Sequence, residues 1–185
     1  ELGELLAREE GKTRAEGVGE VMRAGRIFRY FGGEALRRHG RTLDSTRPGV
    51  EVMTHRESVG VFGLITPWNF PIAIPAWKSA PALAFGNTVV LKPANLTPAI
   101  ACALAQIIHE AGAPPGTFNL VLGRGHIGAA LAAHPDVAGI SFTGSQGVGS
   151  LVAAAAVGRQ ARLQLEMGGK NPLVVLADAD LDRAV

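Results

Sequence analysis

The feature that most constrains the fold is a regular alternation of two patterns along residues 59–185. Short apolar segments, typical of buried strands, alternate with segments whose apolar residues recur at helical spacing. The strand-like segments are residues 59–65, 87–92, 118–122, 139–144, 161–166 and 172–176, and the helical segments are residues 73–85, 97–112, 126–134 and 146–158. Strands and helices that take turns in this way form βαβ units. We therefore predict an α/β fold, in which a parallel sheet has helices on both faces.

The first 58 residues follow different patterns. Residues 1–38 have the spacing of two helices, and residues 42–58 contain a Pro48-Gly49 turn between two short alternating segments, which predicts a hairpin. We place a boundary near Ser58. The predicted units are residues 1–58, with the N-terminal helices and the connecting hairpin, and residues 59–185, with the parallel sheet.

Composition limits the classes of function. The chain has 185 residues, of which 47% are hydrophobic, enough for one sizeable core. No apolar run reaches the roughly 18 residues of a membrane helix, so we expect no membrane insertion. The net charge of +2 comes from scattered residues, which argues against nucleic-acid binding. The single cysteine allows no intrachain disulfide and fits a reducing compartment, so we expect a cytoplasmic protein.

Two further expectations come from residue positions. The histidines lack metal-ligand spacing, so no metal site is expected. The sequence begins ELGELL without an initiator methionine and ends DLDRAV within a helical pattern, so we expect a piece of a longer protein.

Unusual residues follow the first predicted strand, in the segment TPWNFP. Asn69 stands between Trp68 and Phe70, with Pro67 and Pro71 on either side. The prolines restrict the backbone, which would fix the direction of an amide that donates to a developing oxyanion. The alternative is a rigid turn in which Asn69 only caps the local backbone.

Two glycine-rich turns are candidates for a dinucleotide site. GRGHIG, with Gly123, Gly125 and Gly128, has the G-x-G-x-x-G spacing between a strand and a helix, but the acidic residue expected about twenty positions later is missing. FTGSQGVGS offers Gly144 and Ser145 at another strand-to-helix junction, where backbone N–H groups can hold a pyrophosphate. It lacks the Lys-Ser/Thr end of a P-loop, so hydrolysis of a nucleoside triphosphate is disfavoured. Together the two turns favour a dinucleotide site.

Two charged residues end other strands. Lys92, in LKPAN, is placed to reach a ribose or a phosphate, although a surface lysine is the plainer interpretation. Glu166, in QLEMGGKNP, lies among apolar neighbours, where a carboxylate is unfavourable unless something pairs with it or uses it. Glu166 is therefore a candidate acid or base, for which the protein must also supply a nucleophile.

The motifs TPWNFP, LKPAN, FTGSQGVG and LEMGGKNP, in this order and at these separations, resemble the NAD(P)-dependent aldehyde dehydrogenase superfamily. The similarity covers essentially the whole chain. Within the superfamily, residues 63–94 and 164–176 look most like the α-ketoglutaric semialdehyde (2,5-dioxopentanoate) dehydrogenases. The resemblance implies a Rossmann-like cofactor domain, a catalytic domain and a small oligomerisation hairpin. It also implies a longer, homo-oligomeric enzyme, a dimer or tetramer, that uses NAD or NADP.

The resemblance also implies roles for single residues. Asn69 would be the oxyanion amide, and Glu166 the general base, poised by a partly apolar setting. Lys92 would contact the adenosine ribose or its 2′-phosphate, and Ser145 the pyrophosphate. The full set of cofactor-binding residues would be Ile65, Thr66, Pro67, Trp68, Lys92, Asn95, Gly125, Gly144, Ser145, Gly149, Met167 and Gly168.

The nucleophile of this family is a cysteine beyond the glutamate motif, so the resemblance places it outside this chain and implies that residues 1–185 alone are inactive. Cys102 is not a substitute, because no lysine or histidine stands close enough in sequence to stabilise a thiolate. We expect Cys102 to be a buried structural residue. The expected function is oxidation of an aldehyde, with α-ketoglutaric semialdehyde as a candidate, to a carboxylic acid. The alternative is a non-catalytic nucleotide-binding module.

Overall fold

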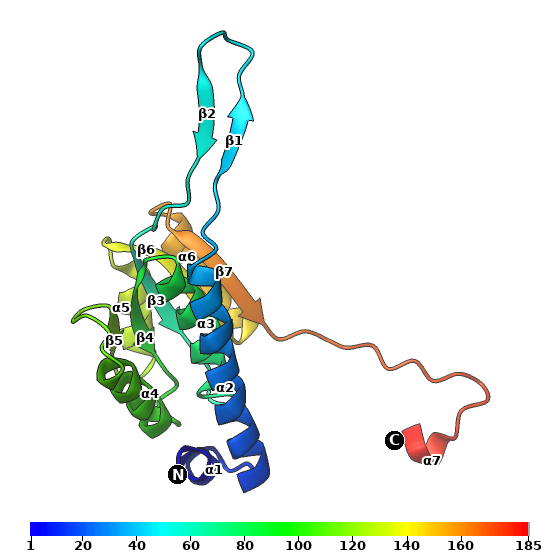
Figure 1. Ribbon diagram of the computed structural model, residues 1–185. Coiled ribbons are helices and arrows are strands. Elements are labelled where there is room, and N and C mark those ends of the chain that lie inside the picture. Colours follow the sequence, from blue (N-terminus) through cyan, green and yellow to red (C-terminus); the bar gives the residue numbers. More distant parts are fainter. Residues whose placement is uncertain (185) are drawn as a thin grey trace.

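A five-stranded parallel sheet forms the centre of the protein (Figure 1). The computed structural model describes residues 1–184, and Val185, the last residue of the predicted second unit, lies outside the described residues. The strand order is β5-β4-β3-β6-β7. The strands are β3 (Val61–Ile65), β4 (Thr88–Lys92), β5 (Phe118–Leu120), β6 (Val137–Gly144) and β7 (Arg162–Met167). The predicted α/β fold with a parallel sheet is confirmed.

Helices lie between consecutive strands and cover both faces of the sheet. They are α3 (Ala73–Ala84), α4 (Pro98–Glu110), α5 (Gly125–Ala133) and α6 (Gln146–Val157). Leu64 and Leu91 pack toward α3 and α4, whereas Ile65, Ile140 and Phe142 pack with the buried residues of α5 and α6. Neighbouring residues of β3 thus serve opposite faces, as the two-residue period of a strand requires.

The N-terminal helices, α1 (Leu2–Glu10) and α2 (Arg14–Ala35), form an additional layer over α3 and α4. Thr13 and Glu16 begin α2 with a capping box, in which each side chain bonds the backbone N–H of the other residue. The two helices approach closely at Gly3 and Gly17, since a Cβ on Gly17 would clash with the Gly3 carbonyl oxygen. A shared cluster that includes Leu6, from α1, joins all four helices in one core.

The predicted hairpin is confirmed. β1 (Arg41–Asp44) pairs antiparallel with β2 (Glu51–Thr54), and Gly49 adopts a φ of 75° in the turn between them. All the residues of both strands are exposed, and Figure 1 shows the hairpin projecting well away from the sheet.

The strand predicted for residues 172–176 is wrong. After β7 the chain extends away from the sheet (Figure 1), and residues 168–176 are exposed and form no strand. A strand requires a neighbour for its backbone hydrogen bonds, and none lies beside residues 172–176 within residues 1–184. The helical pattern near the end is real, because a short helix, α7 (Leu181–Ala184), begins there. No helix of the described chain is long and apolar enough to cross a membrane.

Candidate functional site

The carboxyl ends of the parallel strands gather most of the predicted site residues. Ile65, at the end of β3, lies opposite Lys92 of β4 on one side and Phe142 of β6 on the other. Glu166 of β7 lies opposite Thr143 of β6. The chain proceeds from β3 toward β5 in one direction, and β6 and β7 lie on the opposite side of β3. The boundary between β3 and β6 is therefore a topological switch point, where sheets of this class bind ligands.

The loop that carries Asn69 follows β3 directly. It is anchored by a hydrogen bond from the Thr66 N–H to the Lys92 carbonyl oxygen (3.2 Å), and by one from the Ile74 N–H to the Phe70 carbonyl oxygen (3.1 Å). Asn69 is exposed, and its own carbonyl oxygen accepts a bond of 2.9 Å from the Lys12 ammonium. The turn is therefore rigid, and both interpretations of Asn69, as a structural turn residue and as an oxyanion donor, are compatible with this geometry.

The two glycine-rich turns border the same cleft. A cleft of about 370 Å³ lies between α5 and α6. Gly125, the first residue of α5, and Val148, in the first turn of α6, both line it. The full lining is Ile65, Lys92, Gly125, Gly128, Ala129, Ala132, Val148, Leu151, Val152 and Ala155. The two glycine-rich turns, which the sequence offered as separate candidates, thus lie on two sides of one cleft. This cleft is largely apolar and has a single charged residue in its lining.

That charged residue, Lys92, is only 6% exposed, and burial lowers the pKa of its ammonium. Within residues 1–184 no hydrogen bond or ion pair engages this ammonium. Gly128 keeps the space beside the lysine open, because a Cβ there would stand 3.9 Å from Lys92 Cδ and 3.8 Å from Ile65 Cδ1. Asn95, three residues beyond Lys92, is exposed. The plain surface interpretation of Lys92 is therefore wrong, since its side chain is buried against the cleft.

The start of α6 requires small residues. The Ser145 hydroxyl caps the helix by accepting from the Val148 N–H at 3.4 Å. A Cβ on Gly149 would clash with the sulfur of Met167, and a Cβ on Gly144 would lie 2.6 Å from the Phe142 ring. The end of β7, with Met167, is therefore packed directly against the first turn of α6, whereas Gly168 is exposed beyond the strand.

The setting predicted for Glu166 is not formed by these residues. Glu166 is exposed, because β7 is the edge strand of the sheet. Glu166 lines a cavity of about 360 Å³ with Ile74, Trp77, Lys78, Thr143 and Gln164. Asn69 lines a different cavity, so the structure does not bring these two predicted catalytic residues into one cavity.

Sequence reasoning missed Lys78, which is the second charged residue beside Glu166. Lys78 is 8% exposed, and its ammonium donates to the Ser141 hydroxyl at 2.7 Å. Burial lowers the pKa of Lys78 to about 8, and the nearby Glu166 carboxylate partly opposes that shift. The available signal was a lone lysine within the apolar helical segment of residues 73–85. A lysine that loses its proton near pH 8 beside a carboxylate is suited to moving protons.

The prediction that Cys102 is buried is wrong. Cys102 is exposed, although its helix neighbour Ala101 is completely buried. The buried positions of α4 are Ile100, Ala101 and Leu104, and residue 102 points to the opposite side of the helix. Apolar residues on every side in sequence thus did not imply burial on every side of the helix.

Comparison with known proteins identifies the family. The sequence matches the aldehyde dehydrogenase family over residues 1–185. The chain belongs to this family. It is 49% identical over 186 residues to the α-ketoglutaric semialdehyde dehydrogenase of Bacillus subtilis (strain 168), which covers 100% of this chain and 38% of that protein. It is 54% identical over 162 residues to retinaldehyde dehydrogenase 3 of Mus musculus, which covers 86% of this chain and 31% of that protein.

Solved aldehyde dehydrogenases have the same fold as this chain. An aldehyde dehydrogenase from Brucella melitensis biovar abortus 2308 superposes with a TM-score of 0.92 at 42% identity, over 99% of this chain and 38% of that one. A betaine aldehyde dehydrogenase point mutant from Staphylococcus aureus, in complex with NAD⁺, has a TM-score of 0.92 at 38% identity, over 99% and 37% of the two chains. The predicted family is confirmed, and the chain spans less than two fifths of the length of these relatives.

Proposed function

We propose that the chain is the cofactor-binding part of a longer enzyme that oxidises an aldehyde to a carboxylic acid with NAD or NADP. The observation that carries the proposal is the cleft between α5 and α6 at the carboxyl edge of the sheet, with the buried Lys92 ammonium as its one charged group. An apolar cleft with few polar groups suits an adenine ring and its ribose. A buried cation without a protein partner within the described residues favours an anionic or hydroxyl-rich ligand beside it.

The residues of the cleft fit a dinucleotide. Lys92 would hold the adenosine ribose or its 2′-phosphate, and Gly125 would lie near the adenine. Ser145 and the N–H groups at the start of α6 would hold the pyrophosphate, where the positive end of a helix stabilises an anion. The bound nicotinamide would supply an acceptor for the hydride of the substrate. The relative from Staphylococcus aureus that is solved with NAD⁺ supports this choice of ligand.

The chemical step would use Asn69 and Glu166 from this chain. The Asn69 amide would donate to the aldehyde oxygen as it gains negative charge, and Glu166 would take a proton from a thiol or from the deacylating water. The nucleophile would be a cysteine outside this chain. α-Ketoglutaric semialdehyde is our candidate substrate, supported by the 49% identity to the enzyme of that name over 100% of this chain, whereas retinaldehyde dehydrogenase 3 is 54% identical over 86% of it. The full-length enzyme would be a homo-oligomer, for which the projecting β1–β2 hairpin offers exposed strand edges.

The test is Asn69→Ala in the full-length enzyme. Loss of one oxyanion donor should lower kcat by roughly 100-fold or more, with the Kd of the cofactor nearly unchanged. Gln106→Ala, on the exposed face of α4, is the matched control and should leave kcat and Kd as they are. If cofactor affinity and thermal stability fall together while kcat per folded molecule holds, Asn69 is only a turn residue.

The alternative function, a nucleotide-binding module without chemistry, is favoured by one observation: the only cysteine of the chain, Cys102, lines neither the cleft between α5 and α6 nor the cavity of Glu166. Both functions predict that residues 1–185 alone form no NADH or NADPH from an aldehyde. They differ for the full-length protein, which turns over aldehydes only if it is the dehydrogenase. Steady-state assays of both proteins with several aldehydes therefore separate them.

Cofactor preference can be tested at Asn95. A carboxylate at that position would repel a 2′-phosphate, and the neutral amide removes this repulsion, so we expect appreciable use of NADP⁺. Asn95→Glu should lower kcat/KM for NADP⁺ more than for NAD⁺. A strong preference for NAD⁺ that Asn95→Glu leaves unchanged would contradict this expectation.

A further inference from the structure

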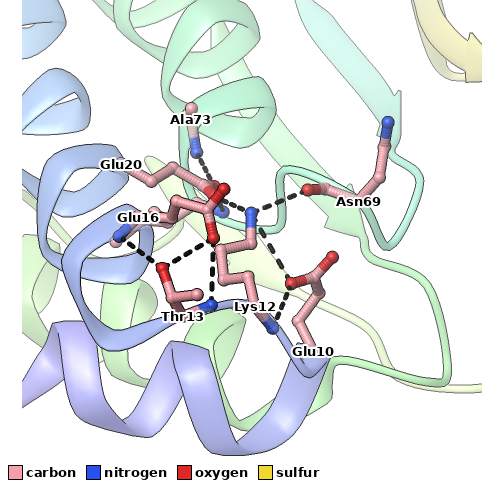
Figure 2. Close-up of polar contacts among 8 residues, drawn as sticks. Glu10, Lys12, Thr13, Glu16, Glu20, Asn69 and Ala73 are labelled. Atoms are coloured by element: carbon pink, nitrogen blue, oxygen red, sulfur yellow. Dashed lines mark hydrogen bonds and ion pairs between the residues drawn. The ribbon is translucent and has the colours of Figure 1, made fainter.

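A partly buried ion pair from the N-terminal region contacts the loop that carries Asn69. Lys12 stands in the short link between α1 and α2, and its ammonium donates to the Glu20 carboxylate at 2.6 Å and to the Asn69 carbonyl oxygen at 2.9 Å (Figure 2). The Glu10 carboxylate lies 3.6 Å from the same ammonium, and the Phe70 ring centroid lies 4.6 Å from it. Lys12 therefore contacts the loop at the Asn69 carbonyl oxygen and at the Phe70 ring, and pairs with two carboxylates.

The second carboxylate oxygen of Glu20 binds the end of the same loop. Glu20 is 5% exposed on α2, and this oxygen accepts from the backbone N–H groups of Ile72 and Ala73, both at 3.0 Å. These N–H groups belong to the first turn of α3, which has no side-chain cap of its own. Free N–H groups at a helix N-terminus favour a carboxylate. One glutamate thus fixes the point where the loop becomes a helix, and its lysine partner fixes the middle of the loop.

Stability alone is a weak explanation for the ion pair of Lys12 and Glu20. A buried ion pair is often no more stabilising than apolar residues of the same volume, because both charges lose their hydration. What the pair supplies instead is position: the Lys12 ammonium bonds Glu20 and the Asn69 carbonyl oxygen at the same time, so a shift of the loop weakens at least one of these two bonds. Since the amide side chain leaves the same residue, displacement of that carbonyl would displace the amide.

We propose that Lys12 and Glu20 are positioning residues for Asn69, which hold the loop from behind so that its side-chain amide is directed at the substrate oxygen. The proposal rests on the proposed role of Asn69 in aldehyde oxidation. In this role neither residue would touch the substrate. Their contribution is to remove the freedom of a short loop whose outer side is exposed.

The test is a double-mutant cycle in the full-length enzyme, with Lys12→Met, Asn69→Ala and both together. Lys12→Met keeps the aliphatic stem over Phe70 and removes only the ammonium. We expect it to lower kcat about tenfold, within the roughly 100-fold that a misplacement of about 1 Å can cause, with the KM for the cofactor within twofold. In the Asn69→Ala background the same change should leave kcat unaltered, because the group it positions is gone.

Two further variants keep the result interpretable. Lys12→Arg, which keeps the charge, should recover most of the lost kcat. Glu20→Gln removes the other member of the pair and should also lower kcat, so it provides the measurement if Lys12→Met folds poorly. Arg8→Met, which removes an exposed ion pair with Glu4 on α1, is the matched control and should leave kcat unchanged. All rates are divided by the folded fraction, measured by thermal unfolding.

The outcomes separate the two proposals. If Asn69→Ala lowers kcat but Lys12→Met and Glu20→Gln do not, the positioning role is wrong and the role of Asn69 stands. An equal fall of kcat for Lys12→Met with and without Asn69→Ala would also overturn it, since the pair would then act elsewhere. If Asn69→Ala itself leaves kcat unchanged, the proposed role of Asn69 fails and the positioning role fails with it.

Discussion

Helices α3 and α4 look alike in topology and differ in what covers them. Each follows a central parallel strand on the same face of the sheet, and each has an N-terminus bound by a glutamate from the N-terminal helices. Glu20 accepts from the first N–H groups of α3, and Glu9 accepts from those of α4, at Ala99 (2.6 Å) and Ile100 (3.0 Å). The same interaction is thus made twice, across 52 or more residues of sequence each time.

The difference between the two helix ends is burial. α3 packs mainly against the 22-residue helix α2, whereas α4 packs mainly against the 9-residue helix α1. Glu20 is therefore almost inaccessible and needs Lys12 as a partner, while Glu9 is half-buried and has no ion pair within the described residues. The comparison teaches that the stability a carboxylate adds at a helix N-terminus depends on how well it is covered. Water competes with the helix N–H groups for the half-buried Glu9 carboxylate, but hardly for that of Glu20.

The largest expected effect is on stability at the two caps. Glu20→Gln should lower the free energy of unfolding by about 2 kcal/mol, less than the roughly 3–5 kcal/mol of a fully uncompensated pair because Glu10 also lies near Lys12. Glu9→Gln should cost only about 0.5 kcal/mol, typical of a charge at an exposed helix end. Urea unfolding of both variants measures the difference, with the exposed Glu57→Gln as the control.

Salt sharpens this comparison. In 1 M NaCl the effect of Glu9→Gln should shrink, since exposed charges are screened, while the effect of Glu20→Gln should change little. Equal losses for the two variants, or equal responses to salt, would mean that the cover over α3 does not decide the strength of its cap.

Sequence predicted the central sheet because its strands are apolar on both faces, and that property depends on neighbouring residues alone. It also predicted the side chains at the strand ends, where motifs such as TPWNFP are local. It could not predict that glutamates of the N-terminal helices bind the N-termini of α3 and α4. Glu20 and the N–H of Ile72, for example, are far apart in the chain, so no local sequence pattern connects them. It was wrong about Cys102 and residues 172–176 for a related reason: an apolar run shows that burial is favourable, but not that a partner is present. The roles of Asn69, Glu166 and the cofactor-binding residues, and the division at Ser58, stay predictions.

The bodies of the two helices should differ in their response to pH. α3 buries Lys78, whose pKa is lowered by burial from 10.5 to about 8, and α4 contains no lysine. Between pH 8 and 10.5 the unfolded chain holds a proton on this lysine that the folded chain has lost, so Lys78 favours folding more as pH rises through this window. The stability of the native chain relative to Lys78→Met should therefore increase by ~1–2 kcal/mol from pH 7.5 to 10, reduced from the full value because the site is partly solvated.

Urea unfolding of the 185-residue chain and of Lys78→Met at pH 7.5, 8.5, 9.5 and 10 gives this relative stability directly. Exposed Lys170→Met, measured at the same pH values, is the matched control for replacing a lysine with methionine. A constant difference for Lys78→Met over the whole range would mean that Lys78 keeps its proton in the folded chain, and that α3 does not hold its lysine in a desolvated site.

The smallest expected effect is at Cys102. It compares the solvent exposure of the outer face of α4 with that of the covered face of α3. Because the thiol is exposed, Cys102→Ser should change the free energy of unfolding by no more than ~0.5 kcal/mol, and the native thiol should react with a disulfide reagent at close to the rate of the unfolded chain. Moving the thiol to α3 provides the matched measurement: Ser79 is completely buried, so Ser79→Cys in the Cys102→Ser background should react only through unfolding, at a rate lower by orders of magnitude. Protection of Cys102 in the native chain would contradict the exposed placement of this face, while rapid reaction at position 79 would show that α2 does not cover α3 as tightly as the cap comparison requires.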